Sequence, residues 1–520
     1  MERPDQEVLL EIPEQPERPK AAVPRGEAKL KSVDRQQTML ATIYVEELIG
    51  PEHKARAIWE VAGRLDLSRF CEGLKTTKGQ AGRSAWDPQL LVSLWVYAYS
   101  EGISSAREIE RLMEWEPGLQ WLGGLQAVSH HTLSDFRVEH QAALDELFTQ
   151  MLGLLEHEGL LSLERVMHDG TKIRAQAGAD SFRREKTVRE HLERAREVVQ
   201  QMGDPREAAG ERSGKEAARE RAARERKQRL DQALQQLQAL QADKSREEEK
   251  REVRVSVTEP EARVMKHGDG AMAPSYNAQI STEAENKIIV GAHLSACSSD
   301  AQSLGPALEE VQRNLGRKPT QVVVDGGFTN RDNIVACAAQ QTDLIGSLPD
   351  PAERSAAAMK AAGIDPAFAP QYFGRDAEAD TLRCPAGRTL EFVRQSQKRG
   401  NRYRQYQARG EDCQACACQP QCCPRHAPQG RTVSRLEQEP AEVAAFRQKM
   451  AQAQAKEIYR QRGAVAEFPN AWIKDKLGLR KFRVRGMVKA GLELVWACLT
   501  YNVMQWMRLR WRTSVLAATA

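Results

Sequence analysis

Residues 321–328 read Gln-Val-Val-Val-Asp-Gly-Gly-Phe, a β-branched apolar run that ends in an acid and two glycines. A short run of this composition predicts a buried strand. Residues 162–170, Ser-Leu-Glu-Arg-Val-Met-His-Asp-Gly, predict a second strand that also ends at an acid followed by glycine. Because acids at the carboxyl ends of neighbouring strands meet at one edge of a sheet, we expect Asp325 and Asp169 to lie close together.

The segments around these runs predict the rest of a mixed α/β sheet. Two strand-like runs are joined by a short polar stretch, as in an antiparallel hairpin, and another follows the predicted buried strand. Helical stretches separate these strands, which is typical of an α/β fold. The expected elements are strands at 276–281, 287–294 and 343–348 and helices at 300–315 and 330–340.

The length of 520 residues allows roughly three domains of ~150 residues each. The first 33 residues combine prolines with charges and predict a disordered leader. A long stretch of Arg, Glu, Gln, Ala and Lys later in the chain predicts a charged helical hairpin. The expected boundaries are 1–33 for the leader, 34–158 for an all-helical domain, 159–350 for the first part of the α/β core with the hairpin inserted at 182–254, 351–440 for a Cys-rich insert, and 441–512 for the second part of the core.

The helical domain contains a pattern that resembles a helix-turn-helix. A helical run from Ile103 is followed by the break Gly123-Gly124 and by Ser129-His-His-Thr-Leu-Ser-Asp-Phe-Arg137, a helix with polar residues at its start. This pattern predicts DNA contacts from His131, Thr132 and Arg137. An ordinary helical hairpin would give the same pattern.

The charge distribution also favours a nucleic-acid partner. The net charge of +4 is uninformative, but residues 471–512 contain ten Lys or Arg, including Arg480, Lys481 and Arg483, against two acids. Such a cluster neutralises phosphates, although a solvated basic helix is the alternative. The first residues contain no apolar stretch that would indicate a secretory signal. The apolar run at 492–507 is too short and too interrupted for a membrane span. We therefore expect a cytoplasmic protein that works at the nucleoid.

A third acid, Glu467, lies in a predicted helix that carries Lys474 two turns later on the same face. Carboxylates brought together by two strands need a neutralising cation. Three carboxylates can hold two Mg²⁺ ions about 3.5–4 Å apart, which stabilise the attacking and leaving oxygens of phosphoryl transfer. An Asp at the end of a strand often has only a structural role, so no single acid predicts a metal site. The prediction rests on the three acids taken together.

Several motifs resemble the DDE transposases of bacterial insertion sequences. They are His168-Asp-Gly-Thr-Lys-Ile-Arg-Ala-Gln-Ala, Ala179-Asp-Ser-Phe-Arg-Arg-Glu-Lys, Val324-Asp-Gly-Gly-Phe and Glu467-Phe-Pro-Asn-Ala-Trp-Ile-Lys474. The resemblance implies a helical N-terminal DNA-binding domain, a ribonuclease H-like core and the catalytic triad Asp169, Asp325 and Glu467 with two Mg²⁺ or Mn²⁺ ions. It also implies binding to terminal inverted repeats and target DNA, and self-association in a synaptic complex. Asp325 follows Asp169 by 156 residues and Glu467 follows Asp325 by 142, spacings that leave room for two inserts.

A related branch of these enzymes carries a Tyr, Arg, Glu, Lys signature on the helix of the catalytic Glu. The candidates here are Tyr459, Arg462, Glu467 and Lys474. The spacing from Glu to Lys matches the signature. Arg462 lies five residues before Glu467, where the signature has four. The resemblance therefore supports the role of Lys474 more strongly than a phosphate-binding role of Arg462.

Six of the ten cysteines lie between positions 384 and 423. A Cys-x-x-Cys pair with further cysteines nearby suits a tetrahedral Zn²⁺ site, and the segment has few apolar residues to form a core. The spacing resembles an insert of the same family, which implies the ligands Cys384, Cys413, Cys416 and Cys422. Cys418 and Cys423 compete for these places, and a reduced insert without metal is the alternative.

Two other functions fit the same sequence. One is a domesticated DDE nuclease that cleaves DNA without mobilising an element. The other is a zinc-containing DNA-binding regulator whose acids are structural, which predicts no cleavage with Mg²⁺ or Mn²⁺.

Overall fold

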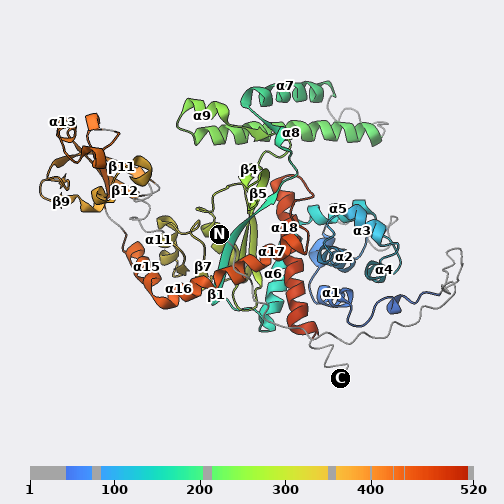
Figure 1. Ribbon diagram of the computed structural model, residues 1–520. Coiled ribbons are helices and arrows are strands. Elements are labelled where there is room, and N and C mark those ends of the chain that lie inside the picture. Colours follow the sequence, from blue (N-terminus) through green and yellow to red (C-terminus); the bar gives the residue numbers. More distant parts are fainter. Residues whose placement is uncertain are drawn as a thin grey trace, which may run out of the picture. The chain divides into compact units, whose positions relative to one another are not determined.

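A computed structural model describes residues 42–72, 84–202, 214–348, 359–398, 401–425, 427–437 and 440–512 (Figure 1). The chain divides into two compact units, Met1–Tyr44 and Val45–Ala520. Of the first unit only residues 42–44 are described, and they are irregular and exposed. The predicted leader at 1–33 lies outside the described residues. None of the described helices combines the length and the apolar character needed to cross a membrane.

A six-stranded mixed sheet forms the centre of the second unit. Strand β5 pairs antiparallel with three strands, β1, β4 and β6, while β7 and β8 continue the sheet parallel to β1. The prediction of a mixed α/β sheet is therefore confirmed. The strands are β1 (Arg165–Arg174), β4 (Arg263–Lys266), β5 (Met272–Glu283), β6 (Ile289–Ser295), β7 (Gln321–Val323) and β8 (Asp343–Ile345).

Alternate residues of the three parallel strands face two different helical layers. Met167, Val323 and Ile345 pack with apolar residues of α16 (Ala453–Arg460) and of the π-helical turn η7 (Gly463–Glu467). The intervening residues, such as Val322 and Leu344, pack with α10 (Leu304–Leu315), α11 (Arg331–Ala339) and α15 (Ala441–Ala451). This two-sided burial explains why the strands read as nearly continuous apolar runs.

The position of Asp169 in its strand and the start of one helix differ from the prediction. Asp169 does not end its strand but lies in the middle of β1, because β1 stays paired with β5 as far as Arg174 after its parallel partner β7 has ended. Helix α10 starts at Leu304 rather than at Asp300, because residues 301–303 form a turn.

The N-terminal helices form one core with the C-terminal helix α18 (Met487–Trp506). They are α1 (Lys54–Gly63), α2 (Pro88–Ser100), α3 (Ala106–Leu112), α4 (Pro117–Gly123), α5 (His130–Glu139) and α6 (Gln141–His157). Helix α18 contacts α2, α5, α6 and β6. Ser105 and Ser129 cap α3 and α5. The predicted break at Gly123-Gly124 is confirmed, since Gly124 ends α4 with a positive φ of 57°.

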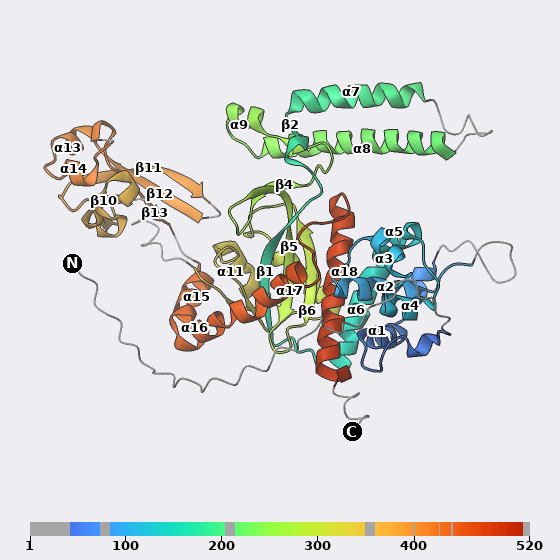
Figure 2. The same cartoon turned by 45° about the vertical axis from the view of Figure 1, so that its right-hand side comes forward.

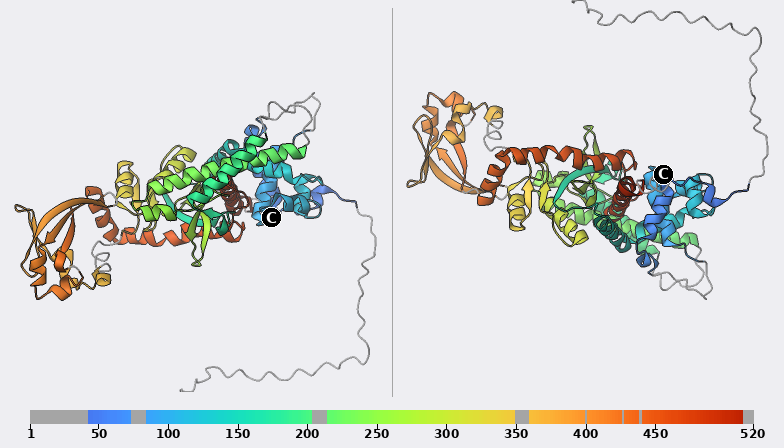
Figure 3. Two further views of the ribbon diagram at one scale, coloured as in Figure 1. Left: turned by 90° about the horizontal axis from the view of Figure 1, so that it is seen from above. Right: turned by 90° about the horizontal axis from the view of Figure 1, so that it is seen from below.

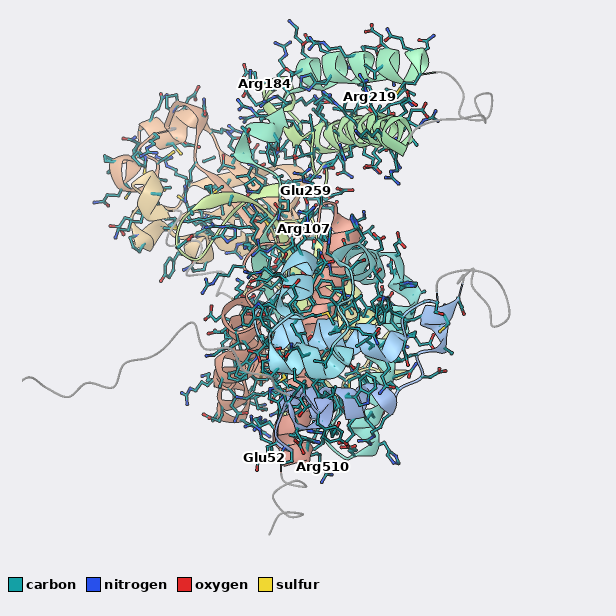
Figure 4. The ribbon with its side chains drawn as sticks, turned by 90° about the vertical axis from the view of Figure 1, so that its right-hand side faces the viewer. Glu52, Arg107, Arg184, Arg219, Glu259 and Arg510 are labelled. Carbon is teal, nitrogen blue, oxygen red and sulfur yellow. The ribbon has the colours of Figure 1, made fainter. Side chains whose placement is uncertain are left out.

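The predicted charged hairpin is also helical. Helices α7 (Glu185–Gln201) and α8 (Gly214–Ala242) lie side by side in Figure 2, and they overlap in the view from above in Figure 3. A narrow apolar seam with Leu192 and Leu230 holds them together. Polar side chains cover the outside, among them Arg184 and Arg219, which Figure 4 labels. The short helix α9 (Glu247–Glu252) and the strand pair β2 (Phe182–Arg183) and β3 (Val255–Ser256) complete this insert.

The Cys-rich insert is a five-stranded antiparallel sheet (Figure 2). Its strands are β9 (Gly374–Asp376), β10 (Thr381–Arg383), β11 (Thr389–Lys398), β12 (Asn401–Ala408) and β13 (Thr432–Leu436), with the short helices α13 (Gly410–Gln414) and α14 (Gln419–Cys422). The sheet buries an apolar cluster that includes Phe373, Leu382, Leu390 and Tyr406. The expectation that this segment lacks a core was therefore wrong, because apolar residues far apart in its sequence meet across the sheet.

Candidate active site

The register of the sheet brings Asp169 and Asp325 to equivalent positions. The last parallel pair between β1 and β7 joins Met167 to Val323. Each acid follows its member of that pair by two residues, so both lie just past the point where the two strands separate. Met167 and Val323 face α16 and η7. Because side chains two positions apart in an extended chain point to the same face, Asp169 and Asp325 are directed toward the layer that carries Glu467.

The third acid is brought in by the π-helical turn η7. Val465 and Ala466 of this turn pack on Met167 and Val323, which places Glu467 on the same side of the sheet as Asp169. Arg462 lies between them, with its guanidinium 3.8 Å from Oδ1 of Asp169 and 3.7 Å from Oε1 of Glu467. Asp169 and Arg462 are mostly buried, whereas the side chain of Glu467 is 65% exposed.

Negative charge is concentrated around Asp169. Burial raises the pKa of Asp169 to about 6; Arg462 opposes the rise, and Asp325 and Asp300 add to it. The carboxylate accepts hydrogen bonds from the backbone N–H of Gly170 at 3.0 Å and from Nδ2 of Asn470 at 3.1 Å. An acid that costs this much to ionise gains most from a nearby cation.

Lys474 lies on the same side of the sheet as the acids. It belongs to α17 (Phe468–Asp475), which begins directly after Glu467, and its ammonium donates to Oγ1 of Thr171 at 2.5 Å. Burial lowers the pKa of Lys474, Arg480 lowers it further, and Asp169 opposes this effect. A half-buried ammonium next to the acids is suited to contact a phosphate group of bound DNA.

The basic residues that follow α17 extend this surface. Lys481 forms an isolated parallel bridge with Arg174, and the N–H of Arg174 donates to the carbonyl of Arg480, so the segment continues the edge of β1. Arg480, Lys481 and Arg483 are exposed, although Arg480 pairs with Asp475. Tyr459 packs beneath the site, partly buried against the cluster of Met167 and Val323.

The predicted DNA contacts of α5 occupy two different environments. His131 is exposed and Thr132 is intermediate in exposure, both in the first turn of the helix. Arg137 is only 6% exposed and lies over the ring of Trp95, with its guanidinium 3.8 Å from the buried Glu493 of α18. The expectation that Arg137 contacts DNA is therefore wrong, because its charge is used in the packing of α5 against α18.

The six cysteines of the insert line one small cavity of about 20 Å³. The thiol of Cys384 accepts from the backbone N–H of Arg388 at 3.2 Å, and that of Cys413 accepts from Arg431 at 3.3 Å. Cys416, Cys418, Cys422 and Cys423 complete the cysteine lining. Thiols supported by backbone donors are the donor type of a zinc site. His426 lies outside the described residues.

Within the described ranges, no group of three His, Cys, Asp or Glu side chains is already arranged to hold a metal ion. Two buried amide oxygens beside the acids nevertheless accept no hydrogen bond, Oδ1 of Asn470 and Oδ1 of Asn277. Clustered carboxylates with unpartnered amide oxygens are the donors that Mg²⁺ and Mn²⁺ prefer. The residues at this edge of the sheet therefore fit a hard divalent cation.

The sequence reasoning missed three polar residues next to this site, Asp300, Asn277 and Gln279. Asn277 and Gln279 are fully buried on β5, and both donate to the carboxylate of Asp300. The alternation Asn-Ala-Gln-Ile-Ser at 277–281 was a signal, because it places polar side chains on one face of a strand that is buried on both sides.

Comparison with known proteins gives two family matches. The family described as "Transposase DDE domain" matches residues 383–507, which include Glu467 and Lys474. The family described as "Transposase domain (DUF772)" matches residues 44–139, which cover most of the N-terminal helices. No curated protein matches the chain. Both matches are to transposase domains, and together they support the resemblance drawn from the motifs, that of a DDE-type insertion sequence transposase.

Proposed function

We propose that this protein cleaves and rejoins DNA strands at the terminal inverted repeats of an insertion sequence, with Asp169, Asp325 and Glu467 as the catalytic carboxylates. Two observations carry the proposal: the charge of Asp325 acts on Asp169, and Arg462 contacts both Asp169 and Glu467. The three acids come from β1, from the segment after β7 and from η7. The mixed sheet, in which β1 pairs antiparallel with β5 and parallel with β7, supports a ribonuclease H-like core.

Each residue has a role that follows from its chemistry. Two divalent ions, when bound by the three carboxylates, would supply the positive charge that stabilises the attacking and leaving oxygens. Lys474, held by Thr171, would position a phosphate of the DNA beside the acids. The exposed side chains of Lys481 and Arg483 would bind the DNA backbone on either side of that phosphate. Arg462 would compensate part of the negative charge of Asp169 and Glu467.

The first turn of α5 is the proposed contact with the terminal repeats. His131 and Thr132 follow the N-cap Ser129, at the end of a helix where base and phosphate contacts are common. Arg137 supports this helix from behind rather than contacting DNA. We further propose that two copies of the chain assemble on paired ends in a synaptic complex.

The test is a cleavage assay with DNA that carries the ends of the element and with Mg²⁺ or Mn²⁺. We expect cleavage at the ends and joining to a target, and Asp169→Ala, Asp325→Ala and Glu467→Ala should each abolish both steps but leave end binding nearly unchanged. The reason is that these acids bind metal rather than phosphate. A matched control is Asp231→Ala on α8, which removes a carboxylate on a helix that contacts α7, α9 and β3.

The same assay separates the alternatives. Binding without cleavage of any DNA by the unaltered protein would favour a regulator. Cleavage without strand joining would favour a nuclease. Near-normal cleavage by one of the three variants would remove that residue from the triad.

A further inference from the structure

Asp300 lies in the loop between β6 and α10, and two buried side chains hold one of its oxygens. Oδ1 accepts from Nδ2 of Asn277 at 2.7 Å and from Nε2 of Gln279 at 3.1 Å. Oδ2 accepts no hydrogen bond from the residues that the structure describes. The two amide donors orient the carboxylate of Asp300 but do not neutralise its charge, because neither donor is charged.

The buried neighbours of Gln279 fix the direction of its amide. One of these neighbours is the buried side chain of His168 on β1. One ring nitrogen lies 2.9 Å from Oε1 of Gln279 and the other 2.9 Å from Oγ of Ser281. Because Oε1 of Gln279 can only accept, His168 donates to it, and the amide nitrogen is left to face Asp300.

The free side of Asp300 faces Asp325. A side-chain carbon placed on Gly327 would lie 3.0 Å from Oδ1 of Asp325 and 3.7 Å from Oδ2 of Asp300, so both carboxylates approach this one point. A carbon placed on Gly170, directly after Asp169, would lie 2.6 Å from Oδ1 of Asp300. The glycines that follow the two catalytic acids therefore leave the space that Asp300 occupies.

A second observation points to a ligand close to Asp300. Both hydrogens of the Asn277 amide are used, one by Asp300 and one by the carbonyl of Cys297 at 3.2 Å, so Oδ1 must point the other way. This oxygen is fully buried and unpartnered, and it lies 3.1 Å from the position of a carbon on Gly170. A buried acceptor without a donor costs free energy unless a cation or a water binds it.

We propose that Asp300 is a fourth carboxylate of the active site and helps to bind the divalent ion on the side of Asp325. This proposal rests on the proposed function, because it assumes that the site binds divalent ions. It assigns Asn277 and Gln279 as positioning residues that direct Oδ2 of Asp300 toward that ion.

The test measures metal binding by the full-length protein without DNA. Mn²⁺ is titrated calorimetrically into the unaltered protein and into Asp300→Asn, which keeps an oxygen for the two amide donors and removes the negative charge. We expect Mn²⁺ to bind Asp300→Asn about 10- to 100-fold more weakly, the loss typical when a group supporting a metal is removed. Asp231→Asn on α8 makes the same chemical change elsewhere and should bind Mn²⁺ as the unaltered protein does.

Thermal melting separates a metal ligand from a structural residue. Without metal, Asp300→Asn should melt no lower than the unaltered protein, because its hydrogen bonds remain and one of several close acids loses its charge. Mn²⁺ should raise the melting temperature of the unaltered protein and raise that of Asp300→Asn much less. Gly170→Ala, which crowds Asp300, should likewise weaken Mn²⁺ binding.

The outcomes distinguish this inference from the proposed function. If Asp169→Asn loses Mn²⁺ binding while Asp300→Asn binds within twofold of the unaltered protein, the role of Asp300 is refuted and the triad stands. A lower melting temperature of Asp300→Asn with unchanged Mn²⁺ affinity would make Asp300 a structural residue only. If neither the unaltered protein nor any variant binds Mn²⁺, the metal-dependent function fails as a whole.

Discussion

Replacing Asp169 by asparagine should stabilise the protein at neutral pH, although it should also stop cleavage. Burial raises the pKa of this carboxyl from 3.8 to about 6. The folded protein therefore holds the proton more tightly than the unfolded chain. Below pH ~4 both states are protonated and the group costs nothing, whereas between about pH 4 and 6 the unfolded chain ionises first and the free energy of unfolding falls.

The size of this effect follows from the two pKa values. The difference between 3.8 and about 6 corresponds to about 3 kcal/mol of lost stability above pH ~6, as an order of magnitude. Asp169→Asn removes this cost. Its hydrogen bonds can be kept, because the unpartnered Oδ1 of Asn470 can accept from the introduced amide after the Asn470 side chain turns over.

The assay is urea unfolding of both proteins with EDTA present, near pH 4 and at neutral pH. Near pH 4 the two free energies of unfolding should agree, and at neutral pH the variant should be more stable by up to about 3 kcal/mol. Asp231→Asn controls for the general loss of one negative charge. A variant that is equally or less stable at neutral pH would refute the idea that the buried Asp169 is costly to ionise, and with it the electrostatic argument for a cation site.

Three further predictions concern other parts of the molecule. Arg137→Ala should destabilise the protein by about 3–5 kcal/mol in urea unfolding, because it leaves Glu493 buried without its cation, and adding Glu493→Gln should recover part of the loss. Elemental analysis of protein purified without chelator should find about one Zn²⁺ per chain, lost in Cys413→Ser; a zinc-free protein with a folded insert would refute the metal site. His131→Ala and Thr132→Ala should weaken binding to terminal DNA without changing the melting temperature, and unchanged binding would exclude the first turn of α5 as a contact.

The sequence predicted the parts of the fold that depend on local patterns. The strand at 276–281 and the start of the strand at 321 were recognisable from their composition, although β7 ends at Val323, before the acid and the glycines. The end of α4 was recognisable because Gly123-Gly124 marks a break. The core of the Cys-rich insert was missed for the opposite reason. Its apolar residues, such as Phe373 and Tyr406, are scattered among charged ones and meet only when five strands pair.

The burial of Arg137 shows the same limit at the level of one side chain. A polar residue in the last turn of a short helix suits DNA contact as well as packing, and local sequence cannot decide between them. The decision is made by Glu493, far away in the chain and on α18, and by the ring of Trp95. A buried acid in an apolar helix such as 492–507 was the available signal, since an acid in that environment needs a partner.

The spacing between Arg462 and Glu467 gives the clearest case of a departure in sequence that the backbone accommodates. In an α-helix, five residues turn by about 500°, which would carry Glu467 roughly 140° around the axis from Arg462, whereas four residues return to nearly the same face. The segment between them is not α-helical but forms the π-helical turn Gly463–Glu467. Such a turn takes in one extra residue, because its hydrogen bonds join each residue to the fifth one along.

The π-helical turn therefore keeps Arg462 and Glu467 on one side, where the guanidinium reaches Glu467 at 3.7 Å and Asp169 at 3.8 Å. The α-helix resumes immediately at Phe468, so the distance from Glu467 to Lys474 remains two regular turns. One added residue is thus absorbed between two charged groups without moving either of them away from the site. The spacing that weakened the match to the Tyr, Arg, Glu, Lys signature is compatible with the same spatial arrangement, and Arg462 can act beside the acids as the signature implies.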